Sequence, residues 1–266
     1  MRLVHNQLRK YAHQVKLTPA WREIHTVFDI GEIRGNQLYL PPEQQRILAE
    51  LAHQAWGIDP LEPLPTGNRV QAAATAIDEK IAPTRPDENH VLVKGRLPAP
   101  LPVLSAQLSL RVPLSSLDLA QIRQVLIIEN LDSFDDWQEF SLPPEIAQSL
   151  VLYRGHNGLA KGLRTLLVNL PQACRITVFP DWDLAGLQIA HTLPRADALL
   201  VPRLSKKLLE KGHRGHFIRQ HRAARYLDTA KLDGWNKIWL DMKEKQISIK
   251  QQHMLALASE LQLIWR

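Results

Sequence analysis

The chain has 266 residues, of which 45% are hydrophobic, so it can form one large domain or two modest ones. Its single cysteine, Cys174, excludes an internal disulfide framework and a multi-cysteine zinc site. No apolar stretch approaches the ~20 residues of a membrane span, and the N-terminal residues lack the apolar core of a signal peptide. We therefore expect a cytoplasmic globular protein without membrane contact. The net charge of +6 favours an anionic partner.

The first third of the chain predicts a small α+β region. Residues 32–41 (EIRGNQLYLP) predict a hairpin that turns at Gly35-Asn36. Apolar residues recur at helical spacing in residues 41–58. This region resembles a winged-helix module that binds DNA or a partner protein, and a plain packing domain fits the pattern equally well.

A second helix is predicted over residues 68–82, with Asn68 as its N-cap. Val70 and Ile77 fall on its apolar stripe, which we expect to face the core. A short strand follows at residues 90–95. Residues 97–104 (LPAPLPVL) hold three prolines in eight positions, a composition typical of linkers. We therefore place the domain boundary near residue 105, with domains at 1–105 and 106–266.

Residues 106–266 alternate strand and helix patterns. Such alternation predicts an α/β domain with a Rossmann-like parallel sheet and helices on both faces. The tail beyond about residue 205 is basic and predicted to be helical, ending in an amphipathic helix over residues 248–264. The predicted strands are 107–112, 124–130, 149–155, 174–181 and 196–203, and the predicted helices between them are 158–170 and 183–193.

Acidic side chains follow two of these strands. Glu129 ends the strand QVLIIEN, and Asp181 and Asp183 follow the strand RITVF. Residues two apart on extended chain point the same way, so the two aspartates face one side with Trp182 opposed. Converging carboxylates favour a hard divalent cation, which predicts a Mg²⁺ or Mn²⁺ site. The alternative is that Asp181 is only an acid at the N-terminus of the next helix and Asp183 a first-turn residue that interacts with the helix dipole.

Metal-assisted hydrolysis of a phosphodiester is the chemistry that such acids support. Asp181 and Asp183 would hold the metal, and Glu129 would either join them or act as a general acid or base. Asn130 would either orient Glu129 or cap the next turn.

Basic residues surround these acids in the sequence. Residues 203–225 carry eight Lys and Arg against one acid, Glu210, which predicts contact with nucleic acid rather than only a solvated helix face. Arg154 and His156 flank Gly155 in the turn RGHNG, and Arg154 could clamp a phosphate there. The residues predicted to bind DNA are Arg154, His156, Lys206, Lys207, Arg214, Arg219 and Arg222.

Taken in order, Glu129, the glycine turn and DWDLAG resemble the Toprim domain of topoisomerases, DnaG-type primases and nucleases. Within that superfamily the chain is similar to the JetD/MksG nuclease subunits of Wadjet plasmid-defence systems, which are topoisomerase VI A-like. The matching residues are Glu129, Asn130, Gly155, Gly158, Asp181, Asp183 and Gly186.

This resemblance implies a metal-dependent endonuclease acting on double-stranded plasmid DNA. It also implies a homodimer that works with an SMC-like ATPase, a kleisin and an accessory subunit. Two alternatives stay open: a topoisomerase-like or primase-like Toprim enzyme, and a non-catalytic DNA-binding subunit. A topoisomerase would need a tyrosine nucleophile, and neither Tyr11 nor Tyr39 lies among arginines, which favours hydrolysis.

The chain departs from the resembled family in its tail. Relatives tend to have a glutamate in a late helix that supports the metal site, whereas residues 250–253 here are Lys-Gln-Gln-His. A glutamine supplies no negative charge, so a second metal would bind weakly or use another acid. The nearest candidates are Asp132, Asp135 and Asp136.

Overall fold

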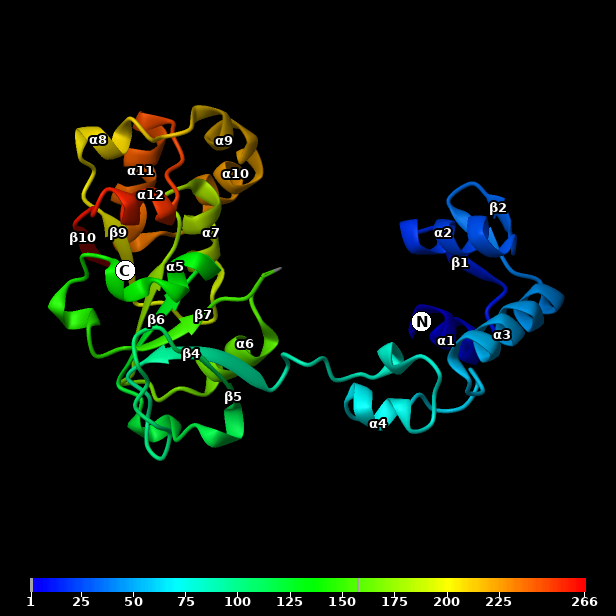
Figure 1. Cartoon of the computed structure of the whole chain (residues 1–266). Coiled ribbons are helices and arrows are strands. Elements are labelled where there is room, and N and C mark those ends of the chain that lie inside the picture. The colour runs from blue at the N-terminus through cyan, green and yellow to red at the C-terminus, as the bar shows by residue number, and fades with distance from the viewer. Residues whose placement is uncertain (1, 157) are drawn as a thin grey trace. The chain divides into compact units, whose positions relative to one another are not determined.

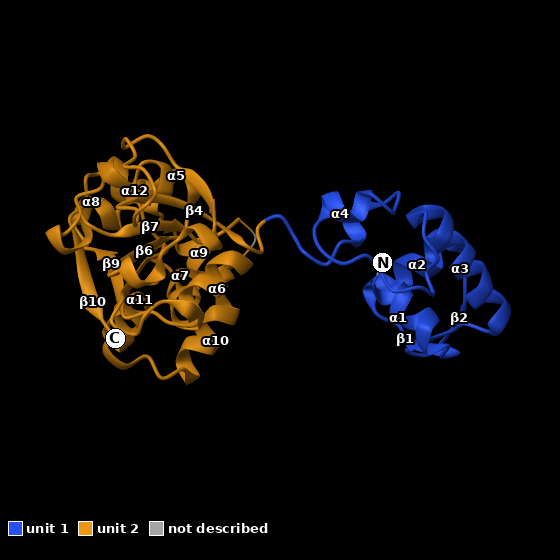
Figure 2. Ribbon diagram, turned by 90° about the horizontal axis from the view of Figure 1, so that it is seen from below, with its two compact units in different colours: residues 1–86 blue, residues 87–266 orange. Residues whose placement is uncertain are grey.

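The computed structural model describes residues 2–156 and 158–266 (Figure 1). The chain divides into two compact units, unit 1 (residues 1–86) and unit 2 (residues 87–266), coloured separately in Figure 2. The division lies at residue 86 rather than near residue 105, because β4 (His90–Gly95) and β5 (Leu110–Pro113) join the large sheet of unit 2. The proline-rich segment 97–104 is therefore a connection inside unit 2, not a linker between units.

The described part of unit 1, residues 2–86, contains four α-helices, a 3-10 helix and a small antiparallel sheet of order β1-β3-β2. The predicted hairpin is confirmed, since Arg34 pairs with Gln37 across the Gly35-Asn36 turn. The predicted helix in residues 41–58 is also confirmed, and it buries Leu48 and Trp56. The elements are α1 (Arg2–Lys10), β1 (Gln14–Lys16), α2 (Pro19–Phe28), β2 (Glu32–Arg34), β3 (Gln37–Tyr39), α3 (Pro42–Trp56) and α4 (Arg69–Ala73).

The helix predicted over residues 68–82 is wrong in its length. Asn68 does cap it, but α4 ends at Ala73 and a short 3-10 helix follows at Glu79–Ile81. The chain turns between them so that the Ile77 N–H donates to the Trp56 carbonyl at the end of α3, at 2.7 Å. Val70 and Ile77 are therefore 80% and 76% exposed instead of facing the core.

Unit 2 is built on a seven-stranded sheet of order β10-β9-β8-β6-β7-β4-β5. The four central strands are parallel, and the outer strands pair antiparallel. Its further elements are β6 (Gln124–Ile128), α5 (Leu131–Asp135), β7 (Leu150–Tyr153), α6 (Lys161–Asn169), β8 (Arg175–Phe179), α7 (Leu184–Thr192), β9 (Ala198–Pro202), α8 (Lys206–Leu209), α9 (Arg214–Arg219), α10 (His221–Thr229), α11 (Asn236–Lys245), α12 (Gln251–Ala256) and β10 (Leu261–Trp265).

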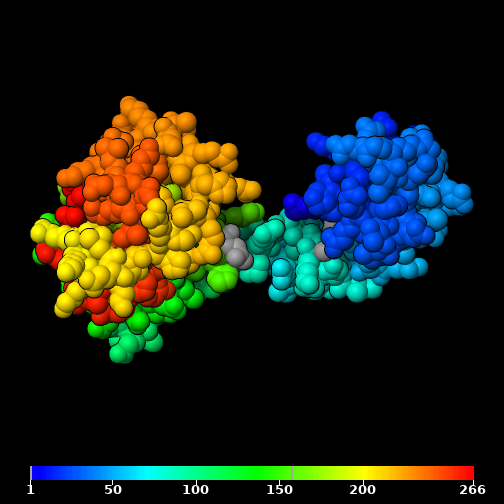
Figure 3. Space-filling model, turned by 90° about the horizontal axis from the view of Figure 1, so that it is seen from above, coloured from blue at the N-terminus to red at the C-terminus, as the bar shows by residue number. Residues whose placement is uncertain are grey.

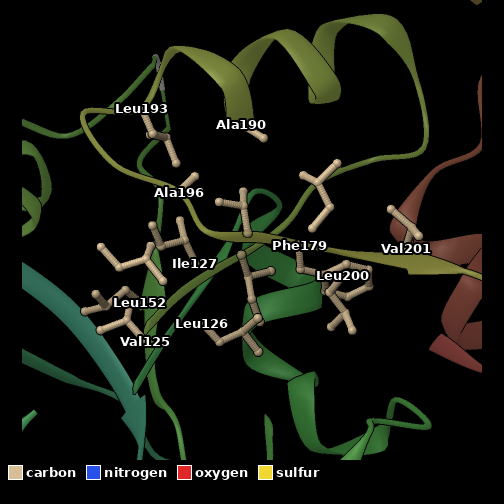
Figure 4. Close-up of a cluster of buried hydrophobic side chains, with 14 of the residues drawn as sticks. Val125, Leu126, Ile127, Leu152, Phe179, Ala190, Leu193, Ala196, Leu200 and Val201 are labelled. Atoms are coloured by element: carbon tan, nitrogen blue, oxygen red, sulfur yellow. The ribbon is translucent and has the colours of Figure 1, made fainter. Parts of the chain in front are cut away.

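The α/β prediction with a mainly parallel sheet is confirmed for unit 2. Strand β6 is apolar nearly throughout because it lies between two parallel neighbours, where both faces of a sheet are covered. Figure 4 shows side chains of this core, among them Leu126 of β6, Leu200 of β9 and Ala190 of α7. Apolar packing of this kind fixes the strand ends that carry the acids.

The amphipathic helix predicted over residues 248–264 is wrong. Only α12 is helical there, and the chain leaves the helix where Ala258 takes a positive φ of 45°. Residues of β10 then pair with the edge of β9, which satisfies backbone groups that the edge would leave open. Within residues 2–156 and 158–266, no helix is long and apolar enough to cross a membrane.

Candidate active site at the ends of β6 and β8

The register of two parallel strands brings Glu129 next to the aspartates. Ile128 pairs with Phe179, so the residues that follow them leave the sheet side by side. The Glu129 N–H donates to the Phe179 carbonyl at 3.2 Å. In return the Asp181 N–H donates to Glu129 Oε2 at 3.2 Å. The structure therefore unites the three predicted acids at the carboxyl ends of β6 and β8, where open α/β sheets place their sites.

Asp181 and Asp183 lie on one side of an extended segment, as predicted. Trp182 between them is 2% exposed and points into the core. Its backbone pairs with Ile249, the Trp182 N–H donating to the Ile249 carbonyl at 2.9 Å and receiving the reverse bond at 3.0 Å. This bridge brings a tail segment more than sixty residues away in sequence against the acids.

Asp183 has two roles at the start of α7. Its Oδ1 accepts the Gly186 N–H at 2.8 Å and caps α7, so Asp183 is the N-cap and not the first-turn residue of the alternative interpretation. Gly186 is required by close approach, because a Cβ there would lie 2.4 Å from the Asp181 carbonyl oxygen. The other oxygen, Oδ2, faces the site. One carboxylate therefore both caps α7 and contributes an oxygen to the site.

Lys250 provides the main counter-charge, and the sequence did not predict it. Its Nζ lies 2.8 Å from Asp181 Oδ2 and 2.9 Å from Asp183 Oδ2. Both aspartates are buried, while the lysine side chain keeps 37% of its surface exposed. The two carboxylate oxygens thus converge on one cationic atom.

Burial and mutual repulsion shift the proton affinities of these groups. Burial, with the charge of Asp181, raises the pKa of Glu129 to about 7, against the opposing effect of Arg154. Burial also raises the pKa of Asp181, although Lys250 counteracts it. For Lys250 burial lowers the pKa, but the charges of Asp183 and Asp181 outweigh it and the net shift is upward. The lysine is therefore a firm cation between two carboxylates.

Two glutamine amides hold the site in shape, and neither was predicted. The Gln251 side chain donates to the Phe179 carbonyl at 2.8 Å and accepts the Asn130 N–H at 3.1 Å, so it ties the ends of β8 and β6 together. Its backbone N–H donates to Asp181 Oδ1 at 2.9 Å. Gln220 donates to Asp183 Oδ2, also at 2.9 Å.

The Gln251 side chain makes two hydrogen bonds that require an amide. Gln251 must donate to a carbonyl and accept from an N–H at the same time, which an ionised carboxylate cannot do. The amide is therefore suited to this position as a strand clamp rather than as a metal ligand.

Arg154 belongs to the site, whereas His156 does not contact the acids. A guanidinium nitrogen of Arg154 lies 3.9 Å from Glu129 Oε1, and its buried Nε has no hydrogen-bond partner within the described residues. His156 is exposed in the turn beyond it. Asn157 of that turn lies outside the described residues. Asn130 caps α5 through the Ser133 N–H, which decides between its two predicted roles.

The predicted DNA-binding residues of the tail lie on three successive helices. Lys206 and Lys207 are on α8, Arg214 and Arg219 on α9, and Arg222 on α10, all exposed. In Figure 3, residues from about 200 onward (yellow to orange) cover much of the visible face of unit 2. Gln220 directly follows Arg219 and reaches Asp183, so the basic segment adjoins the acids. Arg214 instead bonds Gln246.

The carboxylates of Asp181 and Asp183 could bind one divalent cation, because an oxygen of each points to the same position. Within residues 2–156 and 158–266, no group of three or more His, Cys, Asp and Glu side chains is arranged to hold a metal ion. The Lys250 ammonium nevertheless marks a position where Asp181 Oδ2 and Asp183 Oδ2 meet a cation. Mg²⁺ binds through one or two carboxylates with water or phosphate as the remaining ligands, so this pair is sufficient in chemistry. The exposed residues Asp132, Asp135 and Asp136 do not join the pair.

Comparison with known proteins gives a family but no activity. The family model described as "Domain of unknown function (DUF7281)" matches residues 81–263. The chain belongs to this family. The match begins near the start of unit 2 and contains every residue of the candidate site. No curated protein matches the chain.

Proposed function

We propose that the chain is a metal-dependent DNA endonuclease, with its site at the ends of β6 and β8. The observation that supports this most strongly is the pair of buried carboxylate oxygens, from Asp181 and Asp183, converging on one cation position. Buried like charges are costly, and such groups cluster where chemistry requires them. When bound, Mg²⁺ or Mn²⁺ supplies stabilisation of phosphate charge and activation of a water nucleophile.

The protein's own side chains have distinct tasks in this proposal. Asp181 and Asp183 hold the cation, and the Gly186 and Gln220 contacts fix the orientation of Asp183. Glu129 either shares the cation or exchanges a proton with the attacking water. Arg154, beside Glu129, pairs with a phosphate oxygen of the substrate, as a guanidinium does well.

The substrate assigned by this proposal is double-stranded DNA. The exposed basic residues of α8, α9 and α10 supply phosphate contacts next to the acids. We interpret the parallel sheet of unit 2 as a Toprim domain and unit 1 as a winged-helix-like module. On the resemblance to JetD/MksG subunits, the proposal extends to a cytoplasmic homodimer that cleaves plasmid DNA with an SMC-like ATPase, a kleisin and an accessory subunit.

A second candidate is a DNA-binding subunit without catalysis. The observation that favours it is Lys250, which neutralises the aspartates without any metal. This candidate predicts DNA binding that is insensitive to chelator, together with no Mn²⁺ binding at millimolar concentration.

The two candidates separate in one experiment on the full chain. Supercoiled plasmid is incubated with the protein in Mn²⁺ or in EDTA, beside Asp181→Asn as a matched variant. Nicked and linear products that require both Mn²⁺ and Asp181 support the nuclease. Products formed equally by the variant overturn the site. Intact plasmid, with chelator-insensitive DNA binding and no bound Mn²⁺, overturns the nuclease in favour of the binding subunit.

A further inference from the structure

The ammonium of Lys250 occupies the position that a metal would take. Its Nζ contacts Asp181 Oδ2 at 2.8 Å and Asp183 Oδ2 at 2.9 Å. These are the two site-facing oxygens, because Asp181 Oδ1 already accepts the Gln251 N–H and Asp183 Oδ1 already accepts the Gly186 N–H. A divalent cation bound by the same pair therefore competes with the lysine for the same lone pairs.

The backbone around Lys250 is fixed, but its side chain has room to leave. Ile249 is tied to Trp182 by two backbone hydrogen bonds, and the Gln251 N–H is tied to Asp181. The lysine Cα is held between these anchors, whereas 37% of the side-chain surface is exposed. Rotation about side-chain bonds can thus move the ammonium toward solvent without unfolding the tail.

Electrostatics rules out simultaneous occupation. Two cations sharing the same pair of oxygens would lie within a few ångströms of each other, where like charges repel strongly in a partly buried site. Without any cation, the two aspartates would repel in the same way. The tethered lysine relieves the repulsion between the aspartates when no metal is bound, and it competes with a metal for the same oxygens when one is present.

We propose that Lys250 is a resident counter-cation that a divalent metal must displace, so that it sets the metal affinity of the site. This inference rests on the proposed metal site and goes beyond it by naming the residue that opposes loading. In the metal-free protein the ammonium keeps the aspartates neutralised. In the loaded protein the ammonium is released toward solvent, where 37% of the Lys250 side-chain surface is already exposed.

The competition has a calculable consequence for affinity. If the state with Lys250 withdrawn is populated at about 10% or less, the apparent Kd for metal is weakened about tenfold or more. Without the ammonium, every molecule has its aspartates open to the metal, and this weakening of the apparent Kd disappears. Lys250→Met keeps the length and apolar stem of the side chain without its charge, and Lys250→Gln keeps a donor without the charge.

Calorimetric titration with MnCl₂ of the full chain tests the exchange. Both Lys250→Met and Lys250→Gln are expected to bind Mn²⁺ about tenfold or more tightly than the unmodified protein. Their melting temperatures without metal are expected to be lower and to rise more on addition of Mn²⁺. Lys245→Met is the matched control, because Lys245 pairs with Glu244 rather than with the site, and it should bind as the unmodified protein does.

The outcomes separate this inference from the proposed function. Unmodified protein and both variants binding Mn²⁺ equally, or the variants binding more weakly, overturns the exchange while leaving a metal site in place. Absence of Mn²⁺ binding in the unmodified protein and in both variants overturns the metal site itself, and the exchange with it. Should one variant fail to fold, the other decides by the same comparison.

Discussion

The two units bury polar side chains in contrasting ways. In unit 1, buried His5, Gln7 and Gln45 each bond a main-chain carbonyl, as structural polar groups do. In unit 2, buried Asp181 and Asp183 face the same point beside Glu129 and need an ammonium to neutralise them. Burying like charges opposes stability, so only the second pattern points to chemistry.

The net positive charge also lies mainly in unit 2. Residues 1–86 carry ten Lys and Arg against nine Asp and Glu, a net charge of +1, whereas residues 87–266 carry 23 against 18, a net charge of +5. Attraction of a polyanion is therefore expected mainly from unit 2, whereas the sequence left open whether the N-terminal region binds DNA, binds a partner protein or only packs.

The largest effect is expected for Asp183→Asn. The amide preserves the helix cap but lowers the negative charge of the cation site. Cleavage in Mn²⁺ should therefore fall about 100- to 1,000-fold, the cost of losing one preorganised electrostatic group. Asp78→Asn is the matched change in unit 1, because Asp78 also caps a short helix, and it should leave the rate unchanged. Gel quantification of plasmid products measures both. A comparable loss of cleavage in both variants would contradict the assignment of the chemistry to unit 2.

The next effect is on the pH dependence of stability without metal. The folded-state pKa of Glu129 is raised from 4.5 to about 7, so the folded state favours the protonated carboxyl. The associated stability is complete below pH 4.5 and is lost as the pH rises through 7, with a magnitude on the order of 3 kcal/mol. Glu129→Gln should remove this fall, as seen in denaturant titrations at pH 5 and 8. An unchanged pH dependence would refute the burial of this charge.

Glu32→Gln in unit 1 is the control for that measurement. Glu32 is exposed, and its pKa is lowered by a hydrogen bond and the charge of Arg34. Its replacement should leave the fall in stability between pH 5 and 8 as it is in the unmodified protein.

A smaller effect is expected for the buried amides. Gln251→Glu and Gln45→Glu each place a carboxylate against a carbonyl oxygen, and each should destabilise by about 1–3 kcal/mol. Only Gln251→Glu should also weaken Mn²⁺ binding, because only that amide orients the strand ends of the site. Gln252→Glu, at an exposed neighbour, should do neither. Weaker Mn²⁺ binding by Gln45→Glu would show that the units are not independent.

The smallest effect is expected at single surface arginines. Arg219→Ala should weaken DNA binding a few-fold and reduce the slope of log K against log salt by about 0.9, the value for one lost phosphate contact. Arg22→Ala removes an exposed arginine of unit 1 and should change neither quantity. Fluorescence anisotropy at several salt concentrations measures both. An equal reduction of the salt slope in both variants would show that DNA contacts both units.

The sequence could predict those parts of the site that follow from strand periodicity. Glu129 and the aspartates end apolar strands, and the parallel pairing of β6 with β8 brings them together as expected. Lys250 and Gln251 could not be predicted in the same way, because they reach Asp181 from about seventy residues away. Their only signal was the sequence Lys-Gln-Gln-His where an acid was expected.

The errors in the fold share one physical cause. Residues 68–82 and 248–264 both have helical periodicity, yet tertiary hydrogen bonds at Ile77 and along β10 end each helix early. Likewise, the proline-rich segment 97–104 resembled a linker because the pairing of β4 with β7 is invisible in the local sequence. Long-range pairing overrode local pattern in all three places.

The most direct test of the account is a crystal of the full chain soaked in Mn²⁺ and measured by anomalous scattering. We expect one strong peak bound by Asp181 and Asp183 at about 2.1 Å, the metal–oxygen distance of such sites, with the Lys250 ammonium displaced from both carboxylates. A map with Lys250 still bridging the two aspartates, and no anomalous peak beside them at millimolar Mn²⁺, would contradict it.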